Sequence, residues 1–139
     1  MCIRDRFGLT ETVPENYCVR LPSNDEWERA ARGVDGREYP WGDGFNAGYV
    51  NCADSWETDA KDRGTTAVGL FVQGASPDGL LDCSGNVWEW TSSENENYYN
   101  RGGSWDDLTG YVRCAFRYGI RPDLRSYIIG FRLVLGSPW

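Results

Sequence analysis

The chain reads LDCSGNVWEW at residues 81–90, and this stretch is the most informative about the fold. RGGSW follows at residues 101–105 and IGFRL at residues 129–133. Each stretch combines Gly, which lets the backbone turn tightly, with Trp, Phe or Arg, whose planar groups can order a loop-rich core. Asp82 and Glu89 bracket the first stretch, so one short loop offers two carboxylates and several backbone carbonyls. Such a set of oxygen atoms outlines a hard-cation site.

Two upstream stretches, RLPSNDEWERAARG (residues 20–33) and YPWGDG (residues 39–44), complete a pattern. Together the stretches resemble the formylglycine-generating enzyme (sulfatase-modifying factor) family, in the family's order, from about residue 20 to residue 134. The resemblance implies a C-type-lectin-like fold with little regular secondary structure. That scaffold carries copper-dependent oxidases, iron-dependent sulfoxide synthases, catalytically silent modules and hypervariable ligand-binding proteins, and the fold does not choose among them.

The composition favours a loop-rich globular domain. The 139 residues include 7 Trp, 8 Tyr and 17 Gly, and the mean hydropathy is -0.57. A chain of this length fits one domain and can bury a sizeable core. The net charge of -7 argues against nucleic acid as a partner, because phosphate binding relies on clustered Lys and Arg. No apolar run approaches the length of a membrane span, and no signal-peptide pattern is recognisable.

The first residues, MCIRDR, match nothing in the family and resemble a translated sequencing-adapter scar. Residues 1–6 are therefore left out of fold reasoning. Residues 7–139 are expected to form one domain truncated at its N-terminus, because the family domain has further strands and loops before residue 20. The sequence gives no prediction of localisation.

A capping box predicts a short helix over residues 24–32. The Ser23 hydroxyl can accept a first-turn amide proton, and Glu26 can reach back to the Ser23 amide. Trp27 falls on the inner face, and Gly33 ends the helix. The predicted fold class is α+β, with short antiparallel strands, one or two helices and much irregular loop. Strand-like runs lie at residues 87–91, 112–117 and 130–135.

Four cysteines follow the excluded segment, namely Cys18, Cys52, Cys83 and Cys114. An even number allows two disulfides, but the spacings form no CxxC and no zinc signature. Free, mostly buried thiols are the favoured alternative, because Cys is often a small core residue.

The resemblance implies a structural calcium site in the loop of residues 81–90. The matching family positions bind calcium through the side chains of Asp82 and Glu89 and the carbonyls of Gly85 and Val87. Calcium takes several oxygen ligands, and a loop opened by Gly can point carbonyls inward. The alternative is that these polar groups cap turns and bind no metal.

The resemblance also implies a second calcium site. The side chain of Asn51 and the carbonyl of Cys52 match its ligands, and the remaining acid should lie shortly before TAV at residues 66–68. The spacing is offset here, which leaves Asp59 and Asp62 as rivals. Turn capping without an ion is again the alternative.

The residues present do not support the family's catalysis. Formylglycine-generating enzymes bind Cu(I) through two cysteines shortly after the GGS stretch, and soft thiolates suit that ion. Here Asp107 stands at the first position and the second is not Cys, while Cys114 matches a cysteine outside the active pair. The chain contains no His, which the iron-dependent relatives require. We therefore expect no copper, no iron and no formylglycine-generating activity.

Other charged residues have structural interpretations. Asp106 and Asp107 could act as general acid and base, but adjacent acids on an extended segment point to opposite faces, which favours solvated surface. Arg113, Arg117 and Arg132 could grip an anion. The family pattern favours buried internal salt bridges for them instead.

Residues 106–128, called the display segment below, contain no Lys, Glu, Gln, Met or Trp. These are the residues that cannot arise when the adenines of an AAC or AAT codon are randomised, as diversity-generating retroelements do. Rigid aromatic side chains in such a segment also suit a recognition surface. An ordinary family loop with drifted surface residues is the alternative. The candidate ligand-binding residues are Asp106, Asp107, Leu108, Tyr111, Phe116, Tyr118, Ile120, Leu124 and Tyr127.

The leading prediction is a non-catalytic module that binds a protein or small-molecule ligand, with calcium as a structural ion. The rival prediction is the scaffold part of an oxygen-dependent enzyme whose catalytic residues lie in a missing N-terminal region.

Overall fold

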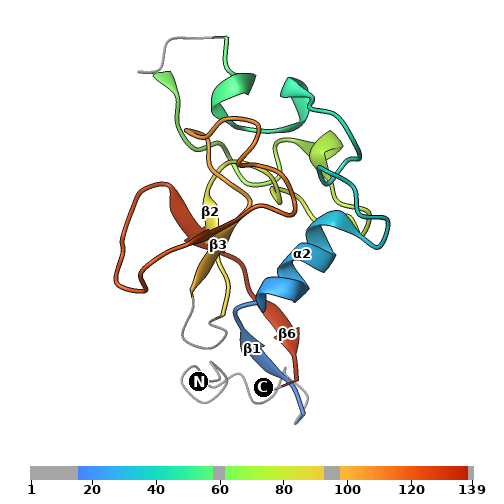
Figure 1. Cartoon of the computed structure of the whole chain (residues 1–139), viewed down its shortest axis with the longest axis vertical. Coiled ribbons are helices and arrows are strands. Elements are labelled where there is room, and N and C mark those ends of the chain that lie inside the picture. Colours follow the sequence, from blue (N-terminus) through green and yellow to red (C-terminus); the bar gives the residue numbers. More distant parts are fainter. Residues whose placement is uncertain (1–15, 58–61, 93–97, 138–139) are drawn as a thin grey trace.

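The computed structural model describes residues 16–57, 62–92 and 98–137, so the excluded segment 1–6 and Asp59 lie outside it. Its elements are short and joined by long turns (Figure 1). One α-helix among short strands confirms the predicted α+β class for the described part. In chain order the elements are β1 (Cys18–Arg20), α2 (Asn24–Arg32), the 3₁₀ turns η2 (Ala47–Tyr49), η3 (Ala53–Ser55) and η5 (Val72–Gly74), β2 (Trp88–Trp90), β3 (Tyr99–Arg101), β4 (Arg117–Gly119), β5 (Ile129–Phe131) and β6 (Val134–Gly136).

The capping box forms as predicted at the start of α2. The Glu26 amide donates to Ser23 Oγ at 3.1 Å, and the Ser23 amide donates to Glu26 Oε2 at 2.8 Å. Trp27 and Ala31 turn one face of the helix into the core. At the other end, the Gly33 amide donates to the Arg29 carbonyl at 3.0 Å and ends the helix.

Four strands form a mixed sheet in the order β4-β3-β2-β5, and β1 pairs with β6 in a separate two-stranded sheet. Both β2–β3 and β3–β4 are antiparallel, but β2 and β5 are parallel. The predicted antiparallel pairing is therefore found for β2–β3 and β3–β4, whereas β5 joins the sheet in parallel. A parallel neighbour requires a long crossover rather than a hairpin, and the chain between β2 and β5 supplies it.

Two predicted strands differ from the structure. The run 112–117 is a series of turns in which only Arg117 enters a strand. Val112 and Cys114 are nonetheless both buried, which explains their strand-like alternation. The run 130–135 is divided between β5 and β6, which belong to different sheets.

The core consists of two small clusters. One joins Trp27 and Ala31 of α2 to Cys83 and Cys114, and the other contains Tyr39, Val50, Cys52 and Val112. Within the described ranges, no helix is both long and apolar enough to cross a membrane, as the sequence predicts.

Arg101 links the helix to the sheet and has no exposed surface. Its Nη1 donates to the carbonyls of Cys114 at 3.2 Å and Phe116 at 2.9 Å. Its Nη2 donates to the Asn24 carbonyl at 3.3 Å and pairs with the Glu28 carboxylate. Arg101 thus joins the helix to the sheet through hydrogen bonds of both terminal nitrogens, while its buried Nε has no hydrogen-bond partner among the described residues. In the sequence, Arg101 is only the first residue of RGGSW, and nothing in that stretch indicates that its guanidinium group is buried.

Candidate functional site

The loop of residues 81–90 depends on an unusual backbone. Asp82 and Asn86 have φ values of 56° and 65°, which are rare for residues other than Gly. At Gly85, with φ 72°, an added Cβ would lie 2.2 Å from the Asn51 carbonyl oxygen. The Asn86 amide donates to that same carbonyl at 2.8 Å. Only Gly therefore allows this close approach of the loop to the turn at Asn51.

Glu89 is buried, and both of its carboxylate oxygens have partners. Trp27 Nε1 donates to Oε2 at 2.6 Å, while Arg132 donates through Nε at 2.5 Å and Nη2 at 2.8 Å. Arg132 also donates to the carbonyls of Leu81 and Asp82. Burial disfavours the charged form of Arg132, but its hydrogen bonds with Glu89 and its attraction to that carboxylate outweigh burial, so the pKa of Arg132 is raised.

Three of the four predicted calcium ligands in this loop, Asp82, Val87 and Glu89, line one hollow of about 220 Å³, whereas Gly85 does not. Arg132 already balances the charge of Glu89, so Asp82 supplies the uncompensated carboxylate. Among the residues that the structure describes, no group of three or more acid, Cys or His side chains is placed to hold a metal ion. A calcium ion would therefore need backbone carbonyls as well. The site stays a prediction.

The second predicted calcium site has its oxygens in use. The side-chain oxygen of Asn51 accepts from Trp56 Nε1 at 2.9 Å. The Cys52 carbonyl accepts from the Ser55 amide at 3.0 Å and from its hydroxyl at 2.8 Å. Of the two candidate acids, one lies outside the described residues and Asp62 is exposed. These contacts match the alternative of turn capping, and the calcium site here also stays a prediction.

Asp107, at the family's first thiol position, anchors the turn that follows the GGS stretch. Its Oδ2 accepts from Trp88 Nε1 at 2.8 Å, from the Ser104 amide at 3.0 Å and from the Ser104 hydroxyl. Its backbone carbonyl accepts from the Ala53 amide at 2.9 Å. The structure gives Asp107 an anchoring role that the sequence did not predict, whereas its neighbour Asp106 is exposed.

Cys52, Cys83 and Cys114 are buried free thiols, and Cys18 is buried as well. Cys83 and Cys114 share one core cluster, and burial raises the pKa of each to about 12. Both thiols are protonated at neutral pH, and the thiolate is the form that binds soft metals. Their chemistry is that of core packing groups.

The display segment turns most of its apolar side chains outward. Phe116 and Ile120 are half-buried. The other five candidates expose between 42% and 77% of their surface, and they are Leu108, Tyr111, Tyr118, Leu124 and Tyr127. The predicted exposure is thus found for five of the seven apolar candidates.

Aromatic contacts tie part of this exposed surface to β2. The Trp88 ring centroid lies 6.0 Å from that of Phe116 and 6.1 Å from that of Tyr118. Phe116 in turn lies 5.0 Å from Tyr111, edge to face. Trp88 therefore packs against the rings of Phe116 and Tyr118, and the hydrogen bond from its indole nitrogen to Asp107 fixes its orientation. The sequence motif at residues 81–90 predicts a core role for Trp88, and nothing in it indicates this contact with the display segment.

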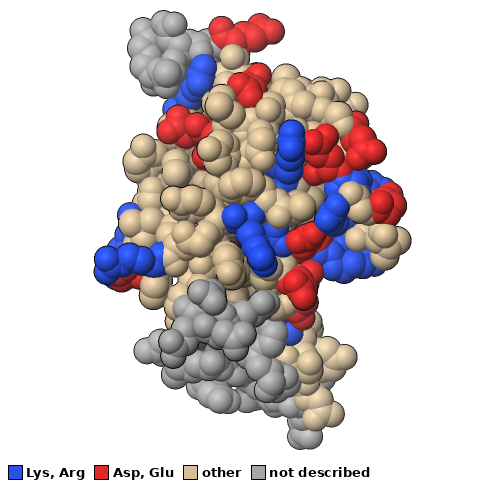
Figure 2. All heavy atoms as spheres, in the orientation of Figure 1, with Lys and Arg blue, Asp and Glu red and all other residues tan. Residues whose placement is uncertain are grey.

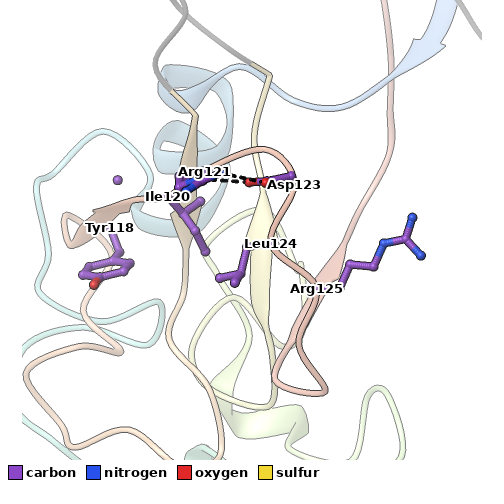
Figure 3. A pocket seen from close by; sticks show the side chains of 7 residues that line it. Tyr118, Ile120, Arg121, Asp123, Leu124 and Arg125 are labelled. Carbon is purple, nitrogen blue, oxygen red and sulfur yellow. Dashed lines mark hydrogen bonds and ion pairs between the residues drawn. The ribbon is translucent and has the colours of Figure 1, made fainter.

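A hollow of about 480 Å³ opens within the display segment (Figure 3). Ile120 and Leu124 point toward one another in it, and the ion pair of Arg121 with Asp123 spans its rim. Arg125 extends away from these side chains. The lining residues are Tyr118, Gly119, Ile120, Arg121, Asp123, Leu124 and Arg125.

Backbone hydrogen bonds hold the walls of this hollow. The Ile120 amide donates to the Tyr98 carbonyl at 3.0 Å, which extends the pairing of β3 with β4. The Leu124 amide donates to the Arg121 carbonyl at 3.1 Å and closes a turn with Pro122 at its second position. Pro at that position fixes φ in advance. The loop is thus preorganised, which lowers the entropy cost of binding.

The prediction that three arginines are buried and paired holds best for Arg132, which pairs with Glu89 and is only partly exposed. Arg113 is exposed and pairs with Glu38 at 2.9 Å. Arg117 is exposed and its guanidinium carbon lies 5.0 Å from the centroid of the Tyr99 ring. Both lie where the display segment runs over the surface, so water rather than core surrounds their guanidinium groups.

Comparison with known families matches residues 5–136 to a sulfatase-modifying factor enzyme 1-like domain, FGE-sulfatase. The chain is 35% identical over 144 residues to the Inactive C-alpha-formylglycine-generating enzyme 2 of Bos taurus, covering 87% of this chain and 46% of that protein. It is 43% identical over 83 residues to the Formylglycine-generating enzyme of Mycobacterium tuberculosis, covering 54% and 27%. The chain thus spans less than half the length of these curated relatives.

Among solved structures, the chain is similar to Treponema denticola variable protein 1, with a TM-score of 0.69 and 26% identity. The match covers 87% of this chain and 48% of that chain. A structural likeness at this level supports the fold implied by the sequence motifs.

Proposed function

Because the chain belongs to the sulfatase-modifying factor enzyme 1-like domain family, we propose that it is a catalytically silent member that binds a protein or small-molecule ligand through its display segment. The observation that carries this proposal is the exposure of five large apolar side chains on a backbone that hydrogen bonds to neighbouring segments hold in place. Exposed apolar clusters on soluble domains usually mark interaction sites.

The proposed lack of catalysis is supported by Asp107, which stands where formylglycine-generating enzymes have the first of their two copper-binding cysteines. Its carboxylate is committed to Trp88 and Ser104, and the nearby Cys114 is a buried, protonated thiol. The bovine relative is itself named inactive. Supplied with Cu(I), oxygen and a peptide carrying a sulfatase-motif cysteine, the chain should form no formylglycine, as mass spectrometry of the peptide would show. Copper-dependent conversion would overturn the proposal.

The finer proposal is that the display segment is diversified by adenine mutagenesis. Its lack of Lys, Glu, Gln, Met and Trp supports this, as does the likeness to a protein named variable. Sequencing the intact gene with its flanks tests the idea. A reverse-transcriptase gene and an adenine-rich near-copy of the 3′ segment are expected beside it, and flanks without both would remove the retroelement from the proposal.

An enzyme scaffold is the second candidate, favoured by the 43% identity to the Mycobacterium tuberculosis enzyme. In that case the catalytic side chains come from a region beyond these 139 residues. The intact gene again discriminates, since a fused histidine-rich domain or a sulfatase neighbour would support the enzyme.

Calcium completes the proposal as a structural ion. Asp82, Val87 and Glu89 lie around one hollow, and carboxylate and carbonyl oxygens are the ligands that calcium takes. The ion would hold the loop of residues 81–90 against the sheet and take no part in ligand recognition.

Panning a phage-displayed random peptide library on the immobilised chain tests the binding surface. Enriched peptides should lose binding to a variant in which all five exposed display residues are Ser. They should keep binding to a control with Val34, Val68 and Val72 replaced by Ser, since these are also exposed but lie outside the segment. Enrichment that depends equally on both sets, or on neither, would contradict the proposal.

A further inference from the structure

We propose that the display segment recognises a protein or peptide segment in which a carboxylate is flanked by apolar side chains, with Arg125 receiving the carboxylate. This ligand class rests on the proposed function, because it specifies the chemistry of the same surface.

The charge of this part of the chain is opposite to that of the whole. Residues 111–132 contain five Arg and a single acid, Asp123, which gives a net charge of +4 in a chain whose total is -7. On the face seen in Figure 2, blue and red groups lie side by side at the edge where Figure 1 shows the loop between β4 and β5. Ion pairs with Glu38, Glu89 and Asp123 balance three of the five arginines, so the positive charge left for a partner is that of Arg117 and Arg125. Electrostatic complementarity then favours an acidic group beside them.

Most of these arginines are already engaged by the protein. Arg113, Arg132 and Arg121 pair with Glu38, Glu89 and Asp123, and Arg117 lies over the ring of Tyr99. Arg125 differs: among the described residues it has no hydrogen-bond, ion-pair or ring partner. It is exposed, and its five N–H donors are available to a ligand.

Arg125 stands between two hollows. It and Leu124 line both the hollow of about 480 Å³ and a second one of about 210 Å³. Ile120 contributes an apolar wall to the first hollow. Trp90 and Phe131 do so in the second, where Phe131 is 64% exposed. A cation between two partly apolar hollows suits a ligand with one anion and an apolar group on each side.

An extended peptide has this pattern when an acid at position i is accompanied by apolar residues at i−2 and i+2. Side chains two apart project to the same face of an extended chain. The guanidinium fork of Arg125 favours a planar carboxylate, which it can bind with two parallel hydrogen bonds. Asp123 does not oppose such an acid, because Arg121 Nε and Nη2 neutralise it at 3.1 and 2.9 Å.

Fluorescein-labelled nonapeptides can test this chemistry by fluorescence anisotropy. Their positions i−2 and i+2 are drawn from Leu, Ile, Phe and Tyr, their central residue is Glu, Gln, Lys or phosphoserine, and the rest are Ser and Gly. The Glu set is expected to bind about tenfold tighter than the Gln set, as a charge-assisted pair would allow. The Lys set should bind more weakly than both. Raising the salt concentration should reduce the preference for Glu.

Three variants locate the effect. Arg125→Gln should make the Glu and Gln sets bind equally while leaving the Gln set unchanged. Arg29→Gln, at an exposed arginine of α2, should change nothing and serves as the control. Asp123→Asn releases Arg121 and should tighten binding of the Glu set about threefold, given the modest value of exposed ion pairs. A melting curve for each variant checks that it is folded.

The outcomes separate the ligand class from the proposed function. Peptides that lose binding to the variant with all five exposed display residues replaced by Ser, but show no preference for Glu over Gln, would overturn the ligand class and leave the binding function in place. Preference for phosphoserine over Glu would reassign Arg125 to phosphate and also overturn it. Failure of every set to bind would count against both. A Glu preference that Arg125→Gln leaves intact would overturn the role of Arg125 and leave the binding function in place.

Discussion

Two neighbouring regions of the chain differ in what their side chains contact. In the framework, defined as residues 81–92 and 98–105, Glu89 and Arg101 are buried and each bonds several partners. In the display segment, residues 106–128, Leu108 and Tyr127 expose more than half of their surface. The framework therefore specifies the backbone, while the display segment, apart from its buried Val112 and Cys114 and the anchoring Asp107, offers exposed side chains that the fold does not require. Function can vary on such a surface without unfolding its support.

The largest expected effect is the loss of Arg101. Arg101→Ala should lower the free energy of unfolding by about 3–5 kcal/mol, because it removes a fully buried side chain and the donor of three backbone carbonyls, while Glu28 keeps only its pair with Arg32. Arg125→Ala, the matched change in the display segment, should cost under about 0.5 kcal/mol. Urea unfolding of both variants measures the difference. Equal losses would remove the distinction between the two regions.

The next effect concerns a glycine of the framework. Gly85→Ala should cost about 3 kcal/mol, because the residue has φ 72° and its Cβ would meet the Asn51 carbonyl oxygen at 2.2 Å. Gly44→Ala is the control: Gly44 also has a positive φ of 84°, but no atom lies within 4 Å of the added Cβ. It should cost only about 1 kcal/mol. If thermal melting ranks the two alike, close packing of the loop is not what selects Gly85.

Calcium gives a third test of the framework. If the loop of residues 81–90 binds the ion only when folded, calcium at 100 times its Kd should add about 2.7 kcal/mol of stability. Asp82→Asn should abolish this increment while keeping an acceptor for the Gly69 amide, which now donates to Asp82 at 2.6 Å. This variant is cleaner than Glu89→Ala, which would also leave Arg132 unpaired. Melting that is indifferent to calcium and to chelator would leave the acids as turn caps.

Local signals in the sequence predicted short elements of the fold better than they predicted its long-range contacts. The capping box fixed α2, because Ser23 and Glu26 lie three residues apart and need no other part of the chain. The parallel pairing of β5 with β2 joins residues about 40 apart, and no local pattern records such a partner. The alternation at residues 112–117 was read as a strand because Val112 and Cys114 are both buried, although turns place them there.

The candidate site was predictable as a segment but not as a surface. Composition alone separated residues 106–128 from the framework. It did not show that Asp107 turns inward to Trp88, or that Arg125 lacks a partner among the described residues, since both depend on packing between distant elements. The local sequence around a single arginine does not show whether its guanidinium group will be buried or exposed.

A smaller effect on stability is expected when low pH protonates Glu26 in the first turn of α2. The pKa of Glu26 is lowered to about 2, chiefly by its hydrogen bonds with Arg20. Its contribution is therefore present above the unfolded pKa near 4.5 and is lost as pH falls toward 2. The side chain is 43% exposed, so solvent screening holds the contribution under about 1 kcal/mol. Glu26→Gln should be less stable than the parent at pH 7 and equal to it near pH 2. A stability gap that persists at low pH would point to lost packing instead.

The smallest effects belong to the display segment, and they test the comparison most directly. Replacing Tyr118 or Leu124 with Ser should cost under about 0.5 kcal/mol each, because roughly half of each side chain already contacts water. Tyr127→Ser should cost about as little, since its ring, like that of Tyr118, has one tryptophan neighbour at about 6 Å and is otherwise exposed. Phe116→Ser should exceed all three, because Phe116 is half-buried between Trp88 and Tyr111. Differential scanning fluorimetry can rank the four variants. A Tyr118→Ser loss as large as that of Phe116→Ser would show that the outward rings help to hold the fold, and the display segment would then be part of the framework.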